Sequence, residues 1–176
     1  MKEHTMKSEN ASDHWPFLDV KDQVVLDLGC GMWYTVDINE NSSVYFNAQG
    51  AKQVIGVDSN PDTLKVITDA VGTDDSYIFI HAHITSADHI KSLLTQYNIT
   101  VIKCDIEGDE IAMKDLTSED MKNIQEITIE YHSINLRLML LDKMIEWGFN
   151  MKSDVHMGNV YTNHPQGILH YSRNGK

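Results

Sequence analysis

The sequence predicts an α/β fold in which helices cover a mostly parallel sheet. Residues 24–28 (VVLDL) form a short, almost continuous apolar run, and such runs suit parallel strands that are buried on both faces. Segments whose apolar residues recur at helical spacing separate this run from later ones. Alternation of strands and helices along a chain is typical of a layered α/β sheet.

The expected elements follow one another along the chain. The strands are residues 24–28, 53–58, 76–80, 100–105, 124–131, 149–156 and 167–172, and the helices are residues 44–49, 61–71, 86–97 and 134–147. Asn41 is a candidate cap for the first helix and Gly50 its stop, while Pro61 suits the opening turn of the second. The last two strands lie close in sequence, which favours an antiparallel hairpin.

The chain has the length of one domain, and its 176 residues, 41% of them hydrophobic, suffice for a core. We expect residues 1–20 to form an N-terminal arm and residues 21–176 to form a single domain. The arm should dock through its WPFL segment at 15–18. The start of the chain lacks the apolar stretch of a signal peptide, and no run is long enough to span a membrane, so we expect a soluble cytoplasmic protein.

The charge balance argues against nucleic acid as a partner. The net charge is −12, from 26 acidic and 14 basic residues, whereas proteins usually meet phosphate backbones with clustered Lys and Arg. Cys30 and Cys104 lack the CxxC spacing of metal sites, so we expect both to be small buried residues.

Two strand ends carry the features of a nucleoside-binding site. Gly29 and Gly31 directly follow the first strand, where glycines allow a sharp turn and a close approach of a ligand to the backbone. Asp58 ends the second strand, where an acid can accept hydrogen bonds from both hydroxyls of an adenosine ribose. Either feature alone is weak, but neighbouring parallel strands place both on one rim, so together they predict a nucleoside cofactor.

The spacing of these residues favours S-adenosylmethionine over a dinucleotide. A dinucleotide site typically has a third glycine, and its acid follows about 20 residues further on. Here Trp33 and Tyr34 follow Gly31, and Asp58 comes later than that spacing. S-adenosylmethionine has no pyrophosphate to cradle, so it is the cofactor that we expect.

The segment KCDIEGDE at 103–110 concentrates charge at the end of the fourth strand. Lys103 lies within the buried strand, where it is costly unless it is paired. Asp105 and Glu107 alternate at the strand end, so at least one should face the cleft. We interpret Asp109 and Glu110 as an acidic loop that caps the next helix.

Glu130 and His132 end the fifth strand, on the same rim as Asp105. Histidine can take a proton near neutral pH. Methylation of a hydroxyl needs a base, and we expect Asp105 or His132 to act as one, with Glu107 and Glu130 shaping the polar wall. A hard cation such as Mg²⁺ between Asp105 and Glu130 is a less favoured alternative, because too few oxygen ligands are visible.

Three segments resemble the FkbM family of class I methyltransferases, most of whose characterised members methylate hydroxyl oxygens. They are VLDLGCG at 25–31, GAKQVIGVD at 50–58 and, more specifically, IKCDIEGDE at 102–110, within a similarity that extends over about 24–149. The resemblance implies a Rossmann-like class I methyltransferase fold with seven strands, the last of them antiparallel. It also implies S-adenosylmethionine-dependent O-methylation of a small molecule or sugar.

The resemblance further implies that Asp27, Gly29 and Gly31 line the methionine end of the cofactor and that Asp58 holds the ribose. The full cofactor site that we expect comprises Asp27, Gly29, Cys30, Gly31, Asp58, Ser59, His83, Ile84 and Asp105. His83 and Ile84 are included in this site because they follow the third strand, and in such folds the residues after that strand often contact the adenine. The expected catalytic residues are Asp105, His132 and Glu107.

Residues 32–41 depart from the usual short glycine turn, since they form a longer loop that carries Trp33 and Tyr34. This loop is expected to cover the cofactor as a lid or to help form the acceptor pocket; it is equally compatible with an altered site. Two other classes of function remain open. One is a non-catalytic binding or scaffold protein that retains the fold, and the other is an NAD(P)-dependent oxidoreductase, which the missing third glycine disfavours.

Overall fold

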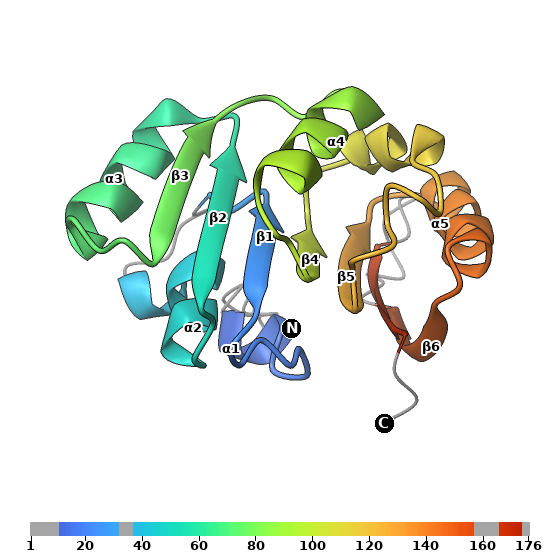
Figure 1. Cartoon of the computed structure of the whole chain (residues 1–176), viewed down its shortest axis with the longest axis horizontal. Helices are drawn as coiled ribbons and strands as arrows, with labels where there is room; N and C mark the ends of the chain where they lie inside the picture. Colours follow the sequence, from blue (N-terminus) through green and yellow to red (C-terminus); the bar gives the residue numbers. More distant parts are fainter. Residues whose placement is uncertain (1–10, 32–36, 157–165, 174–176) are drawn as a thin grey trace, which may run out of the picture.

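The computed structural model describes residues 11–31, 37–156 and 166–173 (Figure 1). Its elements are α1 (Ala11–His14), β1 (Val24–Leu28), the 3-10 helix η1 (Ile38–Glu40), α2 (Ser42–Ala48), β2 (Gln53–Asp58), α3 (Pro61–Val71), β3 (Tyr77–His81), α4 (Ala87–Gln96), β4 (Val101–Cys104), the 3-10 helix η2 (Asp109–Asp115), β5 (Glu126–Tyr131), α5 (Ile134–Glu146), β6 (Asn150–His156) and β7 (Gly167–Ser172). Every predicted strand and helix is present, with ends shifted by at most two residues. Among the described helices, none combines the length and apolar character that a membrane crossing requires.

The seven strands form one sheet in the order β3-β2-β1-β4-β5-β7-β6. Strands β1 to β5 pair in parallel, and β7 pairs antiparallel with both β5 and β6. The predicted mostly parallel sheet with an antiparallel last strand is therefore confirmed, as is the antiparallel pairing of the last two strands. The segment that joins them, residues 157–165, lies outside the described residues.

Alternate strand residues supply hydrophobic clusters on the two faces of the sheet. Leu26 of β1 belongs to the larger cluster, with Ile90 of α4 and Leu140 of α5. Val25, the preceding residue, belongs to the other cluster, with Phe46 of α2. In Figure 1, α1 and α2 accordingly lie on one side of the central strands and α4 and α5 on the other. Burial on both faces explains why β1 reads as an apolar run.

The described part of the N-terminal arm packs on the face that α2 also covers. Trp15 and Leu18 are buried there. Phe17 is more exposed, with its ring centroid 4.6 Å from that of His170, and Pro16 is exposed. The arm therefore docks mainly through two of the four residues of its WPFL segment.

The strand order places a crevice at β1. This strand has β2 on one side and β4 on the other, because the chain first builds outward to β3 and then crosses back. In open α/β sheets ligands bind outside the carboxyl ends of the strands at such a point of reversal. Gly29 follows β1, Asp58 ends β2 and Asp105 follows β4, so the predicted site residues gather at this reversal.

Candidate cofactor and acceptor site

A cavity of about 420 Å³ lies at the carboxyl ends of the central strands, within the usual range of small-molecule sites. The predicted residues that line it are Gly29, Gly31, Asp58, Ser59, His83, Ile84, Asp105, Glu107, Glu130 and His132. They come from the ends of five strands and the loops that follow them. The fold thus brings together side chains that are widely separated in the sequence.

The turn after β1 is held tightly between its neighbours. Gly29 has a φ of +76°, and a Cβ built on it would lie 1.6 Å from the main-chain oxygen of Asp105. Its N–H donates to the Val57 carbonyl at 2.9 Å, which ties the turn to β2 as well. Glycine is required here because the backbone conformation and the approach to Asp105 both exclude a side chain.

The Asp58 carboxylate is oriented by main-chain donors. Oδ2 accepts a hydrogen bond of 2.7 Å from the Gly31 N–H, and Oδ1 accepts one of 2.7 Å from the Asn60 N–H. A carboxylate has about four acceptor positions, so each oxygen retains capacity for a further donor. The half-buried Asp58 is therefore able to accept two ribose hydroxyls at once.

A buried ion pair joins β1 and β4 beneath the cavity. Lys103 Nζ lies 3.1 Å from Asp27 Oδ1 and donates to the Gly29 carbonyl at 2.7 Å. Asp27 Oδ2 accepts hydrogen bonds of 2.6 Å from the hydroxyls of Ser42 and Ser43. Burial lowers the pKa of Lys103, but the charge of Asp27 leads the effects that raise it above its ordinary value, so Lys103 stays charged. Lys103 is paired, as its burial demands.

Two residues of the predicted cofactor set lie under the cavity rather than along it. The Asp27 side chain is fully buried in the ion pair, and the Cys30 side chain is fully buried near Gly56. The expectation that both cysteines are buried is confirmed, and burial raises the pKa of the Cys30 and Cys104 thiols. Asp27 and Cys30 therefore support the glycine turn from below.

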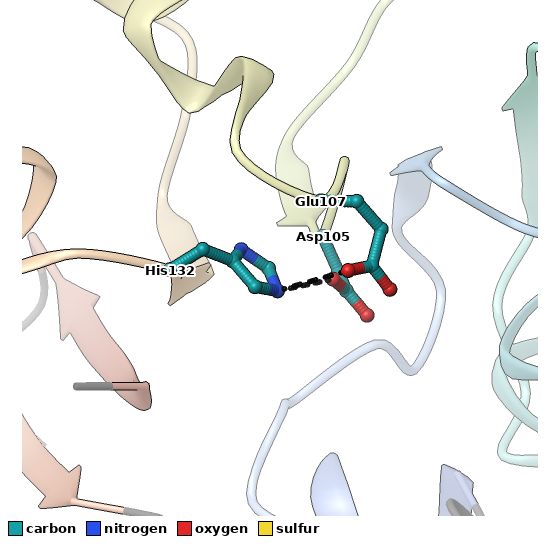
Figure 2. Close-up of side chains that lie close together, drawn as sticks. All are labelled: Asp105, Glu107 and His132. Atoms are coloured by element: carbon teal, nitrogen blue, oxygen red, sulfur yellow. Dashed lines mark ion pairs between the residues drawn. The ribbon is translucent and has the colours of Figure 1, made fainter. Parts of the chain in front are cut away.

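His132 faces a group of carboxylates on one wall of the cavity. Its Nε2 lies 3.4 Å from Glu107 Oε2, 3.8 Å from Asp105 Oδ1 and 3.9 Å from Glu130 Oε1. Figure 2 shows the imidazole pointing at Asp105 and Glu107 from the opposite side of the group. Strand β4 ends at Cys104, so both acids sit on the following loop, and both reach the cavity. We call these four residues, Asp105, Glu107, Glu130 and His132, the His132 wall.

Glu110 has a role that the sequence does not reveal. It is fully buried in the first turn of η2, and its Oε1 accepts hydrogen bonds from the N–H groups of Ile106 (3.1 Å) and Gly108 (3.3 Å), which precede the helix. The expectation that Asp109 and Glu110 form a loop that caps this helix is wrong, because both residues lie within η2, which has no side-chain cap hydrogen bond. The same oxygen lies 3.1 Å from His132 Nδ1. An ionised carboxylate can only accept, so Nδ1 carries the hydrogen and Nε2 is directed to the other acids.

The His132 wall favours positive charge. Burial lowers the pKa of His132, but the hydrogen bond to Glu110 and the charges of Glu110, Asp105 and Glu130 outweigh burial and raise it to about 9. At neutral pH the ring is therefore an imidazolium in this arrangement. As a base it would first have to release the proton on Nε2.

The remaining predicted residues lie along the edge of the cavity. Ile84 is buried, and His83 Nε2 lies 2.6 Å from Asp109 Oδ2 at an exposed position. His14 and Trp15 of the arm also line the cavity, although neither is among the site residues predicted from the sequence. Two contacts link the arm to residues of the cavity: Lys103 Nζ lies 5.5 Å from the Trp15 ring centroid, and the Ser12 hydroxyl donates to Glu40 Oε2 at 2.8 Å. Trp33 and Tyr34 fall outside the described residues.

Comparisons with known proteins identify the fold. No protein-family profile and no curated protein matches the chain. Among solved structures, a proposed S-adenosylmethionine-dependent methyltransferase from Listeria monocytogenes matches with a TM-score of 0.60 and 12% identity, over 93% of this chain and 98% of that one. Fibrillarin from Aeropyrum pernix, with natively bound S-adenosyl-L-methionine, matches with a TM-score of 0.57 and 13% identity, over 86% of this chain and 68% of that one.

An uncharacterised protein from Listeria monocytogenes serotype 4b gives a TM-score of 0.61 at 9% identity. The match covers 90% of this chain and 65% of that chain, slightly less than two thirds of its length. At such identities the likeness concerns the fold alone. Together with the strand order, these structures show that the chain has the Rossmann-like fold of S-adenosylmethionine-dependent methyltransferases.

Proposed function

We propose that this protein is an S-adenosylmethionine-dependent methyltransferase of the FkbM type that methylates a hydroxyl oxygen of a small molecule or sugar. The observation that carries the proposal is the joint placement of the Gly29 turn and the Asp58 carboxylate on the rim of one cavity. Fibrillarin, which has the same fold, binds this cofactor. The proposal assigns the ribose to Asp58 and the adenine to the side of His83 and Ile84.

The His132 wall is the part of the cavity that we assign to the acceptor. The sulfonium of the cofactor already carries an activated methyl group, so the protein must mainly align the acceptor oxygen and exclude water. Three carboxylates on this wall disfavour an anionic acceptor and favour a neutral hydroxyl that can donate a hydrogen bond. As the new C–O bond forms, Asp105 and His132 are the groups that we propose handle the hydroxyl proton.

Replacing Asp58 with Asn tests the cofactor assignment. We expect the affinity for S-adenosylhomocysteine to fall roughly 10- to 100-fold, because a hydrogen bond to a charged group contributes about 1.5–3 kcal/mol. Calorimetric titration measures the change. Asp62→Asn is the matched control, since Asp62 is exposed on the neighbouring helix and should leave the affinity unchanged. Equal affinities for both variants would remove Asp58 from the ribose site.

The same titrations, together with an assay of methyl transfer, separate the rival functions. An oxidoreductase would bind NAD in preference to S-adenosylhomocysteine, which reverses the order of affinities that we expect. A scaffold protein would bind the cofactor yet release no methyl group to any member of a broad set of hydroxylated acceptors. If titration with S-adenosylmethionine and with S-adenosylhomocysteine gives no heat of binding, the proposed function itself is rejected.

Replacing Asp105 with Asn and, separately, His132 with Ala tests the His132 wall. We expect each change to lower kcat by about 10²- to 10⁴-fold, the usual contribution of a positioned acid–base group, with a smaller effect on cofactor affinity. Asp115→Asn, an exposed change on η2, is the control and should keep full turnover. If neither replacement slows methyl transfer, the wall takes no part in handling the proton.

A further inference from the structure

Three atoms that are able to bind a metal ion converge on the His132 wall. They are Oδ1 or Oδ2 of Asp105, an oxygen of Glu107 and a ring nitrogen of His132, all within 4.8 Å of one another (Figure 2). We propose that these residues bind a divalent transition-metal ion of the Mn²⁺ or Zn²⁺ class. The proposal rests on the proposed function, because it assigns the ion to the acceptor side of the same cavity.

The spacing of the three side chains suits one ion. His132 Nε2 lies 3.4 Å from Glu107 Oε2 and 3.8 Å from Asp105 Oδ1. Two ligand atoms that each lie about 2.0–2.1 Å from a tetrahedral ion are about 3.4 Å apart. Glu107 Oε2 already lies at this separation, and a small rotation of the Asp105 side chain, which is 26% exposed, would close the remaining difference.

The kinds of ligand indicate the class of ion. Imidazole suits Zn²⁺, Fe²⁺ and related ions, whereas carboxylates alone suit Mg²⁺, Ca²⁺ and Mn²⁺. One imidazole with two carboxylates therefore favours Mn²⁺ or Zn²⁺ over Mg²⁺. This set differs from the pair of Asp105 and Glu130, which the sequence offers as a candidate for Mg²⁺ but which is disfavoured for its small number of oxygen ligands. In the structure, His132 and Glu107 join Asp105, and Glu130 Oε1 lies 3.9 Å from His132 Nε2.

Glu110 supplies the support that a metal-binding histidine usually has. Histidine ligands typically donate their second ring N–H to a carboxylate, which fixes the ring and the nitrogen that faces the ion. Glu110 Oε1 accepts from His132 Nδ1 at 3.1 Å and is itself held by two main-chain N–H groups. Nε2 is thereby directed to Asp105 and Glu107.

The ion would complete the acceptor site. Three protein ligands leave coordination positions for water or substrate, as in catalytic metal sites. A metal-bound hydroxyl loses its proton more readily, because the ion stabilises the alkoxide. Methyl transfer to that oxygen would form the C–O bond as the methyl–sulfur bond breaks and would yield the methyl ether and S-adenosylhomocysteine. With the ion bound, Asp105 and His132 would hold it rather than accept the hydroxyl proton, which would pass to solvent.

Metal titration of the full chain tests the proposal. After removal of metals with a chelator, Mn²⁺ is titrated and free Mn²⁺ is counted by electron paramagnetic resonance; Zn²⁺ is titrated in competition with a chromophoric chelator. We expect one ion per chain. His132→Gln and Glu107→Gln should each lower the affinity strongly, and Glu110→Gln should lower it about 10- to 100-fold, as changes to outer partners do. Glu119→Gln, an exposed acid away from the wall, should change nothing.

Cofactor binding is measured on the same samples, so the two proposals fail separately. No saturable binding of either ion, or binding that Glu107→Gln and His132→Gln leave unchanged, would overturn the metal site while S-adenosylhomocysteine still binds. Absence of S-adenosylhomocysteine binding with and without metal would reject the proposed function instead. Glu107 is largely exposed and lies on a loop, so its variant should fold even if His132→Gln does not.

Discussion

Lys103→Ala is expected to destabilise the protein by about 3–5 kcal/mol, because removal of one partner of a buried ion pair leaves the other charge unpaired. The Asp27 carboxylate would stay in a site with no solvent exposure, where the hydroxyls of Ser42 and Ser43 would be its remaining partners among the described residues. Natural domains are stable by about 5–15 kcal/mol, so the loss would be a large share of the total. Urea unfolding followed by circular dichroism measures it.

Two further variants show whether the charge itself causes this loss. Lys65→Ala removes a lysine from an exposed pair with Asp69 and should cost at most about 0.5 kcal/mol. The double variant Lys103→Met, Asp27→Asn removes both charges and should recover part of the stability that Lys103→Ala loses. An effect of Lys103→Ala as small as that of Lys65→Ala would contradict the role of this pair.

The architecture was predictable because burial leaves a direct trace in sequence. Strands buried on both faces read as apolar runs, and the glycine and acid at the ends of β1 and β2 lie outside those runs. The parallel order then requires that Gly29, Asp58 and Asp105 meet at one edge. Such residues are recognisable because their placement follows from topology alone.

The roles of Asp27 and Glu110 could not be predicted in the same way. Strand alternation sets Asp27 apart from its neighbours Leu26 and Leu28 and turns its side chain to the serines of α2, but the sequence does not say which face the ligand occupies. The contact of Glu110 with His132 depends on a residue that follows β5 and lies 22 positions later in the chain. From the sequence alone, an acidic residue at the start of a short helix is interpreted as a residue that caps the helix.

Gly29→Ala is expected to abolish cofactor binding and to destabilise the fold severely. The new Cβ would lie 1.6 Å from the main-chain oxygen of Asp105, so β1 and β4 could not keep their spacing at the cavity. The clash is with backbone, which has no flexible end that moves away. Lys103, which donates to the Gly29 carbonyl, would lose that position as well. Titration with S-adenosylhomocysteine and urea unfolding measure the two effects.

Gly72→Ala separates this clash from the general cost of a side chain at positive φ. Gly72 has a φ of +69°, close to the +76° of Gly29, but a Cβ there meets no atom within 4 Å. Its variant should lose about 1–3 kcal/mol through backbone strain and should bind the cofactor product as the unmodified protein does. Both variants place a side chain at positive φ, but only Gly29→Ala adds the clash, so a loss of binding confined to Gly29→Ala reports the approach of the two strand tips. A Gly29→Ala protein that binds S-adenosylhomocysteine as tightly as Gly72→Ala would show that this approach does not shape the site.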